Sequence, residues 1–300
     1  MSEWDPSTWA HNLDETGRLQ FFTEPQRNAL GAVTLVSAPL SAVGSALICY
    51  TIFKQRTKNN ASNQDASFQR LMLGLSLTDL IASISMFGLA PWAIPRQDRD
   101  YNVSYAMGTV ATCQASGFLL NFWFGTTIYT AFLCLYYMAV ICYAKKDDWT
   151  SRWIEPWSHG MAWGYPLVFG AYAAAQDLFN PVDSLPGFCT VATYPFGCVY
   201  LQDIDCTRGS ESAFIIPYYT IMGILGLALI TICVSMTMIV FAVRRIEQRQ
   251  SRYSVEKSTF NGPNEYFDKL SFMWAPMPLP PCRLLWHNPL IRQSLQNEST

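Results

Sequence analysis

Residues 212–243, SAFIIPYYTIMGILGLALITICVSMTMIVFAV, contain no Asp, Glu, Lys or Arg. About 20 consecutive apolar residues are enough to cross the hydrocarbon core of a bilayer, which is roughly 30 Å thick. Inside lipid the backbone must satisfy its own hydrogen bonds, and a helix does so within one segment. The stretch therefore predicts a transmembrane helix, and it indicates an integral membrane protein in contact with the lipid bilayer.

Four further stretches of the 300-residue chain carry one charged residue or none. The predicted fold class is therefore all-α, an integral membrane helical bundle with five transmembrane helices. The uncharged run 101–144 is long enough in principle for two spans, but no turn signal interrupts it after Cys113, so one long tilted helix is the simpler interpretation. The predicted spans lie near residues 29–53, 71–95, 106–142, 156–177 and 213–243.

The basic residues predict how the spans are oriented. The segments outside the spans alternate between few and many basic residues. When every second segment is grouped, one group holds 15 of the 20 Lys and Arg residues. Because basic loops stay in the cytoplasm, an extracellular N-terminal tail (1–28), a transmembrane domain (29–245) and an irregular cytoplasmic tail (246–300) are expected. The N-terminus lacks a basic-then-apolar signal peptide, so the first span is expected to act as the insertion signal.

Four of the nine cysteines lie in or beside segments predicted outside the cell: Cys113, Cys189, Cys198 and Cys206. An oxidising exterior favours disulfides among them, and four cysteines allow three pairings. Asn102, in Asn102-Val103-Ser104, is a candidate glycosylation site in a loop that is also predicted outside.

Asp79 is the one acidic or basic residue well inside a predicted span. A carboxylate at that depth must face the protein, pair or be protonated, so Asp79 is either part of an ion or water site or a structural hydrogen-bond hub. Asn121 is a second candidate for an intramembrane polar site. It belongs to a four-residue repeat with Gly117, Gly125 and Tyr129, a pattern that more often serves close helix packing.

Three tryptophans, Trp149, Trp153 and Trp157, recur every four residues before and at the start of the fourth predicted span. Tryptophan is enriched where a membrane meets water, so these residues are predicted to be interfacial anchors. A contact surface for a cytoplasmic partner is the alternative.

Three short motifs resemble G protein-coupled receptors, especially the cyclic-AMP-receptor-like and secretin-like groups: LSLTDL at 75–80, CQASGF at 113–118 and FCTV at 188–191. The resemblance covers about Leu30 to Arg252. It implies a seven-helix-receptor arrangement in the plasma membrane, an extracellular ligand, a heterotrimeric G protein as partner and a Cys113–Cys189 disulfide, which leaves Cys198 to pair with Cys206. The sequence LYYMAV at 135–140 lacks the Asp-Arg-Tyr motif of rhodopsin-like receptors, as the cyclic-AMP-like group does.

The chain departs from the family after Arg252. Its longest uncharged run there, Leu270–Cys282, is too short and too rich in proline to span a membrane. Helices six and seven are therefore expected to be missing, and a truncated receptor-like signalling protein is the leading hypothesis. The alternatives are a non-signalling five-helix partner of full-length receptors, as a homo- or hetero-dimer, and a small transporter or channel. An enzyme is not expected, because the sequence has no His–Glu metal spacing, no Ser or Cys nucleophile beside a His and no glycine-rich phosphate loop. No metal, no cofactor and no nucleic-acid partner are predicted.

Overall fold

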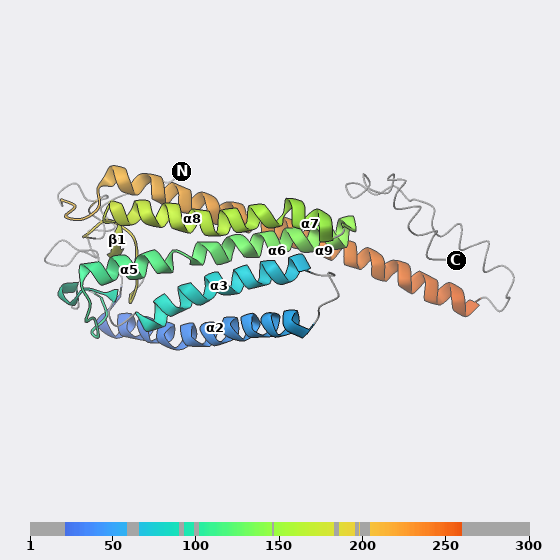
Figure 1. Cartoon of the computed structure of the whole chain (residues 1–300), viewed down its shortest axis with the longest axis horizontal. Helices are drawn as coiled ribbons and strands as arrows, with labels where there is room; N and C mark the ends of the chain where they lie inside the picture. The colour runs from blue at the N-terminus through green and yellow to red at the C-terminus, as the bar shows by residue number, and fades with distance from the viewer. Residues whose placement is uncertain are drawn as a thin grey trace. The chain divides into compact units, whose positions relative to one another are not determined.

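The computed structural model describes residues 22–58, 66–89, 93–98, 102–145, 147–182, 186–195, 198 and 205–259. This part of the chain is mostly helical (Figure 1). Its elements in chain order are α2 (Glu24–Lys58), α3 (Ala66–Gly88), the short 3₁₀ helix η1 (Arg96–Asp98), α5 (Val110–Leu120), α6 (Trp123–Tyr143), α7 (Asp147–Trp153), α8 (Glu155–Ala175), β1 (Phe179–Pro181), β2 (Cys189–Val191) and α9 (Glu211–Thr259).

Within the described residues, three helical segments are long and apolar enough to cross a membrane: Glu24–Arg56, Val110–Tyr143 and Ser212–Gln248. They coincide with the first, third and fifth predicted spans, and they are compatible with an integral membrane protein. Helices α3 and α8 occupy most of the second and fourth predicted spans, with 23 and 21 residues respectively.

Helix α2 begins before the predicted boundary at residue 29 because its start is capped. The side chain of Gln26 accepts the backbone N–H of Thr23 at 2.9 Å, and the Thr23 carbonyl accepts the N–H of Arg27 at 3.0 Å. The sequence TEPQ thus supplies the glutamine half of a capping box. At the other end of the chain, α9 continues past residue 245 to Thr259.

The third predicted span is one run of helix with an irregular turn in its middle. At Asn121 and Phe122 the regular helical bonds between residues four apart give way to bonds between residues three apart. The Phe122 N–H donates to the Leu119 carbonyl, and the Phe124 N–H donates to the Asn121 carbonyl. Such three-residue bonds tighten the backbone locally. The turn divides the span into α5 and α6.

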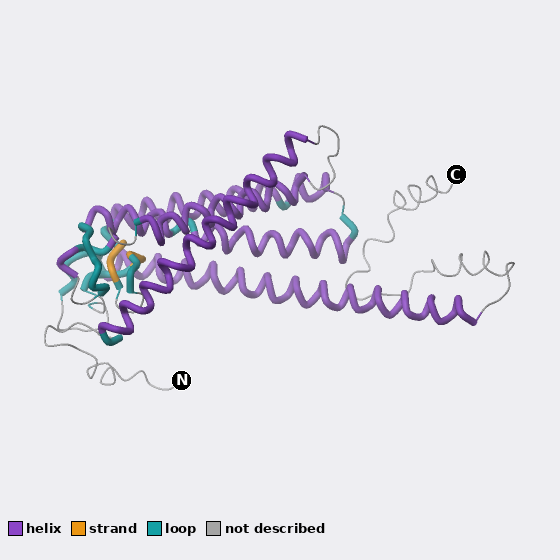
Figure 2. The backbone as a smooth tube through the Cα atoms, turned by 90° about the horizontal axis from the view of Figure 1, so that it is seen from below, coloured by secondary structure: helices purple, strands orange, loops and turns teal. Residues whose placement is uncertain are grey.

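The chain divides into two compact units. The first contains residues up to Leu133 together with Asp147–Thr231. In it α2 packs along α3, and α3 in turn packs against α5, α7 and α8. The strands and most loops of this unit gather at one end of its helices (Figure 2). We call this region the loop cap; its described residues are 93–98, 102–109, 176–182, 186–195, 198 and 205–210.

The predominance of helices agrees with the all-α prediction, and a small antiparallel sheet in the loop cap is an exception to it. Strands β1 and β2 pair with Asn180 opposite Thr190 and Pro181 opposite Cys189. One buried cluster is formed by Ala93, Ile94, Val103, Ala106, Cys113 and Cys189. Another contains Ala173, Leu178, Phe179 and Ala213.

The second unit contains Cys134–Lys146, which completes α6, and the chain from Ile232 onward, of which the described part completes α9. Within it, the Cys142 thiol lies 3.6 Å from the Met238 carbonyl oxygen, so the two helical segments are in contact.

Candidate functional site

The four cysteines singled out in the sequence form two disulfides, Cys113–Cys189 and Cys198–Cys206. The first joins the start of α5 to strand β2, and the second closes a loop of the cap. The pairing implied by the family resemblance is therefore found.

Asn102 lies in the loop cap with only 1 % of its surface exposed. Its side-chain Nδ2 donates to the Val182 carbonyl at 3.3 Å, and its Oδ1 accepts the Gly187 N–H at 2.8 Å. Its own carbonyl accepts the Nε–H of Arg27 at 2.9 Å. A glycan would have to be attached through the same buried Nδ2, so these contacts argue against the predicted glycosylation. Asn102 instead joins α2 to two segments of the cap.

Three further contacts involve the loop cap. The Tyr194 hydroxyl donates to Asp98 Oδ1, and the Arg208 guanidinium lies over the Tyr194 ring, 3.9 Å from its centroid. The Tyr105 hydroxyl sits so close to Gly31 of α2 that a Cβ there would be 2.3 Å from it. Burial raises the pKa of this Tyr105 hydroxyl.

Asp79 on α3 is bonded to helix α2. Oδ2 of its carboxylate accepts the hydroxyl of Ser41 at 2.8 Å and that of Ser45 at 2.6 Å. Because the two serines are one helical turn apart, both reach the same oxygen. The sequence allowed two interpretations of Asp79, an ion or water site and a structural hydrogen-bond hub. These contacts fit the second interpretation.

Asn121 has a different partner from Asp79. Its Nδ2 donates to the Pro166 carbonyl of α8 at 2.9 Å. One turn further, a Cβ on Gly125 would lie 2.6 Å from the Ala162 carbonyl oxygen. That carbonyl is the one that Pro166, lacking an N–H, leaves without its usual helical partner. The four-residue repeat thus serves close packing of the third span on α8, and the structure does not join Asn121 and Asp79 in one contact.

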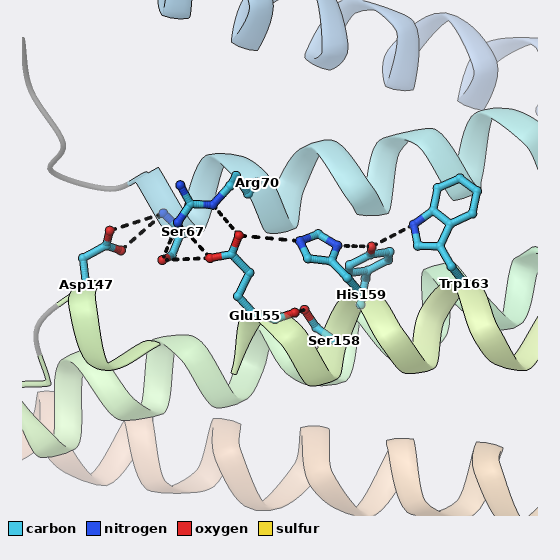
Figure 3. A network of polar contacts seen from close by, with 8 residues as sticks. Ser67, Arg70, Asp147, Glu155, Ser158, His159 and Trp163 are labelled. Carbon is cyan, nitrogen blue, oxygen red and sulfur yellow. Dashed lines mark hydrogen bonds and ion pairs between the residues drawn. The ribbon is translucent and has the colours of Figure 1, made fainter. Parts of the chain in front are cut away.

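A chain of polar side chains connects α7, α3, α8 and α6, and Figure 3 shows most of it. We call it the polar chain; its members are Asp147, Ser67, Arg70, Glu155, His159, Tyr129 and Trp163. At its α7 end, both carboxylate oxygens of Asp147 accept the backbone N–H of Ser67, at 3.3 and 3.4 Å. This N–H belongs to the first turn of α3, where backbone donors lack partners within the helix and a negative charge is favourable.

The next link is an ion pair between α3 and α8. Arg70 donates from Nε to Glu155 Oε1 and from Nη2 to Oε2, the latter at 2.8 Å. The Ser67 hydroxyl adds a bond to Glu155 Oε2 at 3.4 Å. The guanidinium therefore holds both oxygens of the carboxylate, a two-point geometry that lysine could not reproduce.

The innermost links involve an imidazole, a phenol and an indole. His159 Nε2 lies 3.8 Å from Glu155 Oε1, and His159 Nδ1 lies 2.5 Å from the Tyr129 hydroxyl oxygen. The same hydroxyl accepts the indole N–H of Trp163 at 3.0 Å. Tyr129 is fully buried and its ring lies against Gly74 of α3, where a Cβ would be 2.4 Å from Cζ.

The polar chain was not predicted from the sequence. Its signal was the four-residue spacing of Glu155, His159 and Trp163, which places the three side chains on one face of α8. The partners Arg70 and Tyr129 come from distant parts of the sequence. Trp153 and Trp157, beside the polar chain in sequence, are exposed, as interfacial anchors would be.

No group of three or more metal-ligating side chains occurs among the described residues. The chain matches no protein-family model, and no curated protein matches it.

Proposed function

We propose that the chain is a receptor-like transmembrane signalling protein of the plasma membrane, with five spans arranged like the first five helices of a G protein-coupled receptor. The loop cap would face the exterior, and the polar chain would lie toward the cytoplasm, as the distribution of Lys and Arg favours. An extracellular ligand would act on the cap, and a heterotrimeric G protein would be the inner partner.

One observation carries this proposal. The span Val110–Tyr143 is bonded at its start to strand β2 through Cys113–Cys189, and Tyr129 further along it bonds to His159 in the polar chain. The loop cap is therefore connected to this span by a covalent bond, and the span is connected to the rest of the polar chain by a hydrogen bond. Receptors need such a path between their two faces, because ligand and partner bind on opposite sides of the membrane.

The test is G protein activation in membranes that contain the whole chain. We expect binding of a non-hydrolysable GTP analogue to purified heterotrimers to exceed that in membranes without the chain, and Cys113→Ser to remove the excess. Cys233→Ser, which changes an exposed free thiol on α9, is the matched control and should keep the excess. The proposal fails if the chain reaches the cell surface and activates no G protein class.

A non-signalling partner of full-length receptors is the second candidate, and the exposure of α9 favours it. Little of the span Ser212–Gln248 is buried, and large apolar side chains such as Ile216, Tyr219 and Leu227 face outward. This face suits another membrane helix as well as lipid. Coexpression should then change the surface level of a full-length receptor, whereas unchanged trafficking and signalling would remove this candidate.

A further inference from the structure

The protons of the Tyr129–His159 contact can be assigned from its neighbours. The indole nitrogen of Trp163 is only a donor, so the Tyr129 oxygen accepts from it. Tyr129 has one proton of its own, and His159 Nδ1 is 2.5 Å away. In the neutral form of the imidazole, Tyr129 therefore donates to Nδ1. The ring proton then lies on Nε2, on the side of Glu155.

The charged and titratable groups around His159 come from each neighbouring helix. Glu155 precedes it by one turn on α8, Arg70 from α3 occupies both oxygens of that carboxylate, and Tyr129 approaches from α6. Asp147 of α7 lies beyond them, on the Ser67 N–H. The negative charge of Glu155 is thus already paired with Arg70 when His159 is neutral.

We propose that His159 is a proton-sensitive latch between α6 and α8: its neutral ring accepts the Tyr129 hydroxyl, and its protonated ring releases it. A proton from water adds at Nδ1, and both ring nitrogens then donate. The Tyr129 O–H can then no longer donate to Nδ1 and must rotate away from it, so this buried hydroxyl proton loses its acceptor. The new positive charge is attracted to Glu155, one turn back on the same helix.

Two features make the latch responsive. The His159 side chain is 36 % exposed, so protons can reach it, whereas Tyr129 is fully buried and has no room to move toward Gly74. Histidine is the side chain whose change of charge falls nearest the range of pH that cells experience. Loss of this acceptor would weaken the bond between α6 and α8 in the span that carries the disulfide. The regulatory meaning of this motion rests on the proposed function, but the latch itself does not.

The test measures thermal unfolding of the purified full chain in lipid nanodiscs between pH 5 and pH 8. Because the folded state holds the neutral ring, the stabilisation is present above the imidazole range and is lost as pH falls through it. We expect Tm to be roughly 2–4 °C lower at pH 5 than at pH 7.5 through this bond. In His159→Asn the amide oxygen can replace Nδ1 as acceptor and takes up no proton, so this part of the pH dependence should vanish.

Two further variants complete the test. Tyr129→Phe should lower Tm at pH 7.5 and abolish the part of the Tm difference between pH 5 and pH 7.5 that His159 causes. The chain has three histidines, and replacing the other two, His11→Gln with His287→Gln, should leave the wild-type pH profile unchanged. The latch is overturned if His159→Asn keeps the full pH dependence of the wild type.

A spectroscopic measurement covers the case in which a variant fails to fold. Nitrogen NMR of the wild-type chain labelled at histidine should show one ring with its neutral proton on Nε2 and an accepting Nδ1, converting to the doubly protonated form as pH falls. A proton on Nδ1 at neutral pH would refute the latch. Because neither measurement uses a G protein, a failed activation assay would count against the proposed function alone.

Discussion

Ser45 donates its hydroxyl proton to Asp79 across 2.6 Å, and this contact joins α2 to α3 inside the bundle. A hydrogen bond to a charged group contributes about 1.5–3 kcal/mol. We expect Ser45→Ala to lower the free energy of unfolding by an amount in this range, measured by denaturant or thermal unfolding in nanodiscs. Ser37→Ala is the matched control, because its hydroxyl bonds only to the Thr34 carbonyl of the same helix. Equal losses in both variants would show that the Asp79 hub stabilises nothing.

Gly125 should not tolerate a side chain. A Cβ there would meet the Ala162 carbonyl oxygen at 2.6 Å, and that atom belongs to the backbone of α8 and cannot rotate away. We expect Gly125→Ala to cost roughly 1–3 kcal/mol of stability. Gly164→Ala on α8 is the control, since its Cβ would have no atom within 4 Å and alanine favours helix. A Gly125→Ala protein as stable as the Gly164→Ala protein would contradict the close approach.

The two disulfides should differ in importance. Cys113–Cys189 closes a segment of sequence separation 76, whereas Cys198–Cys206 closes one of separation 8. On chain-entropy grounds the first contributes roughly 4–5 kcal/mol and the second roughly 2–3 kcal/mol. We expect Cys113→Ser to abolish delivery to the cell surface and Cys198→Ser to reduce it less, as measured by surface biotinylation. Normal surface levels of Cys113→Ser would refute the role given to this bridge.

The Arg70–Glu155 pair should show energetic coupling. Both groups are partly accessible, so a coupling of about 0.5–1 kcal/mol is expected in a double-mutant cycle of Arg70→Ala and Glu155→Ala. Arg70→Lys should lose most of this coupling, because an ammonium group cannot hold both carboxylate oxygens. The same cycle with Arg152, an exposed residue on α7, in place of Arg70 should give a value near zero. Equal coupling in the two cycles would mean that the two-point geometry has no energetic effect.

Asn102 should remain unglycosylated in the folded protein. Its amide is buried and bonded to Val182 and Gly187, so treatment with an endoglycosidase should leave the electrophoretic mobility of the chain unchanged. We also expect Asn102→Gln to reduce the amount of folded protein. A mobility shift that disappears in Ser104→Ala would show that the sequon is used.

The membrane character and the location of the bridged cysteines could be predicted from the sequence, because both follow from local composition. The early start of α2 was also readable, since TEPQ at residues 23–26 is a capping pattern. The turn at Asn121 was not, because it has no glycine or proline of its own and Asn121 is bonded to the Pro166 carbonyl, 45 residues away.

The polar chain was equally hidden from sequence reasoning. Arg70 and Glu155 are 85 residues apart, and only the packing of α3 against α8 brings them together. The Asn102 sequon shows a related limit of sequence patterns, because it specifies three residues and says nothing of their burial. Single-sequence patterns identify helices and their faces, whereas partners across a bundle depend on the fold.

The irregular turn at Asn121 and Phe122 changes what the span can transmit. A straight helix passes rotation and translation undiminished along its axis. A turn with three-residue bonds in the middle of a helix is a place where the helix can bend, so its two parts can turn separately. The part before the turn is fastened to strand β2 by Cys113, and the part after it is fastened to α8 by Tyr129. The two attachments therefore lie on opposite sides of the turn, and Asn121 holds the turn itself against the Pro166 carbonyl of α8.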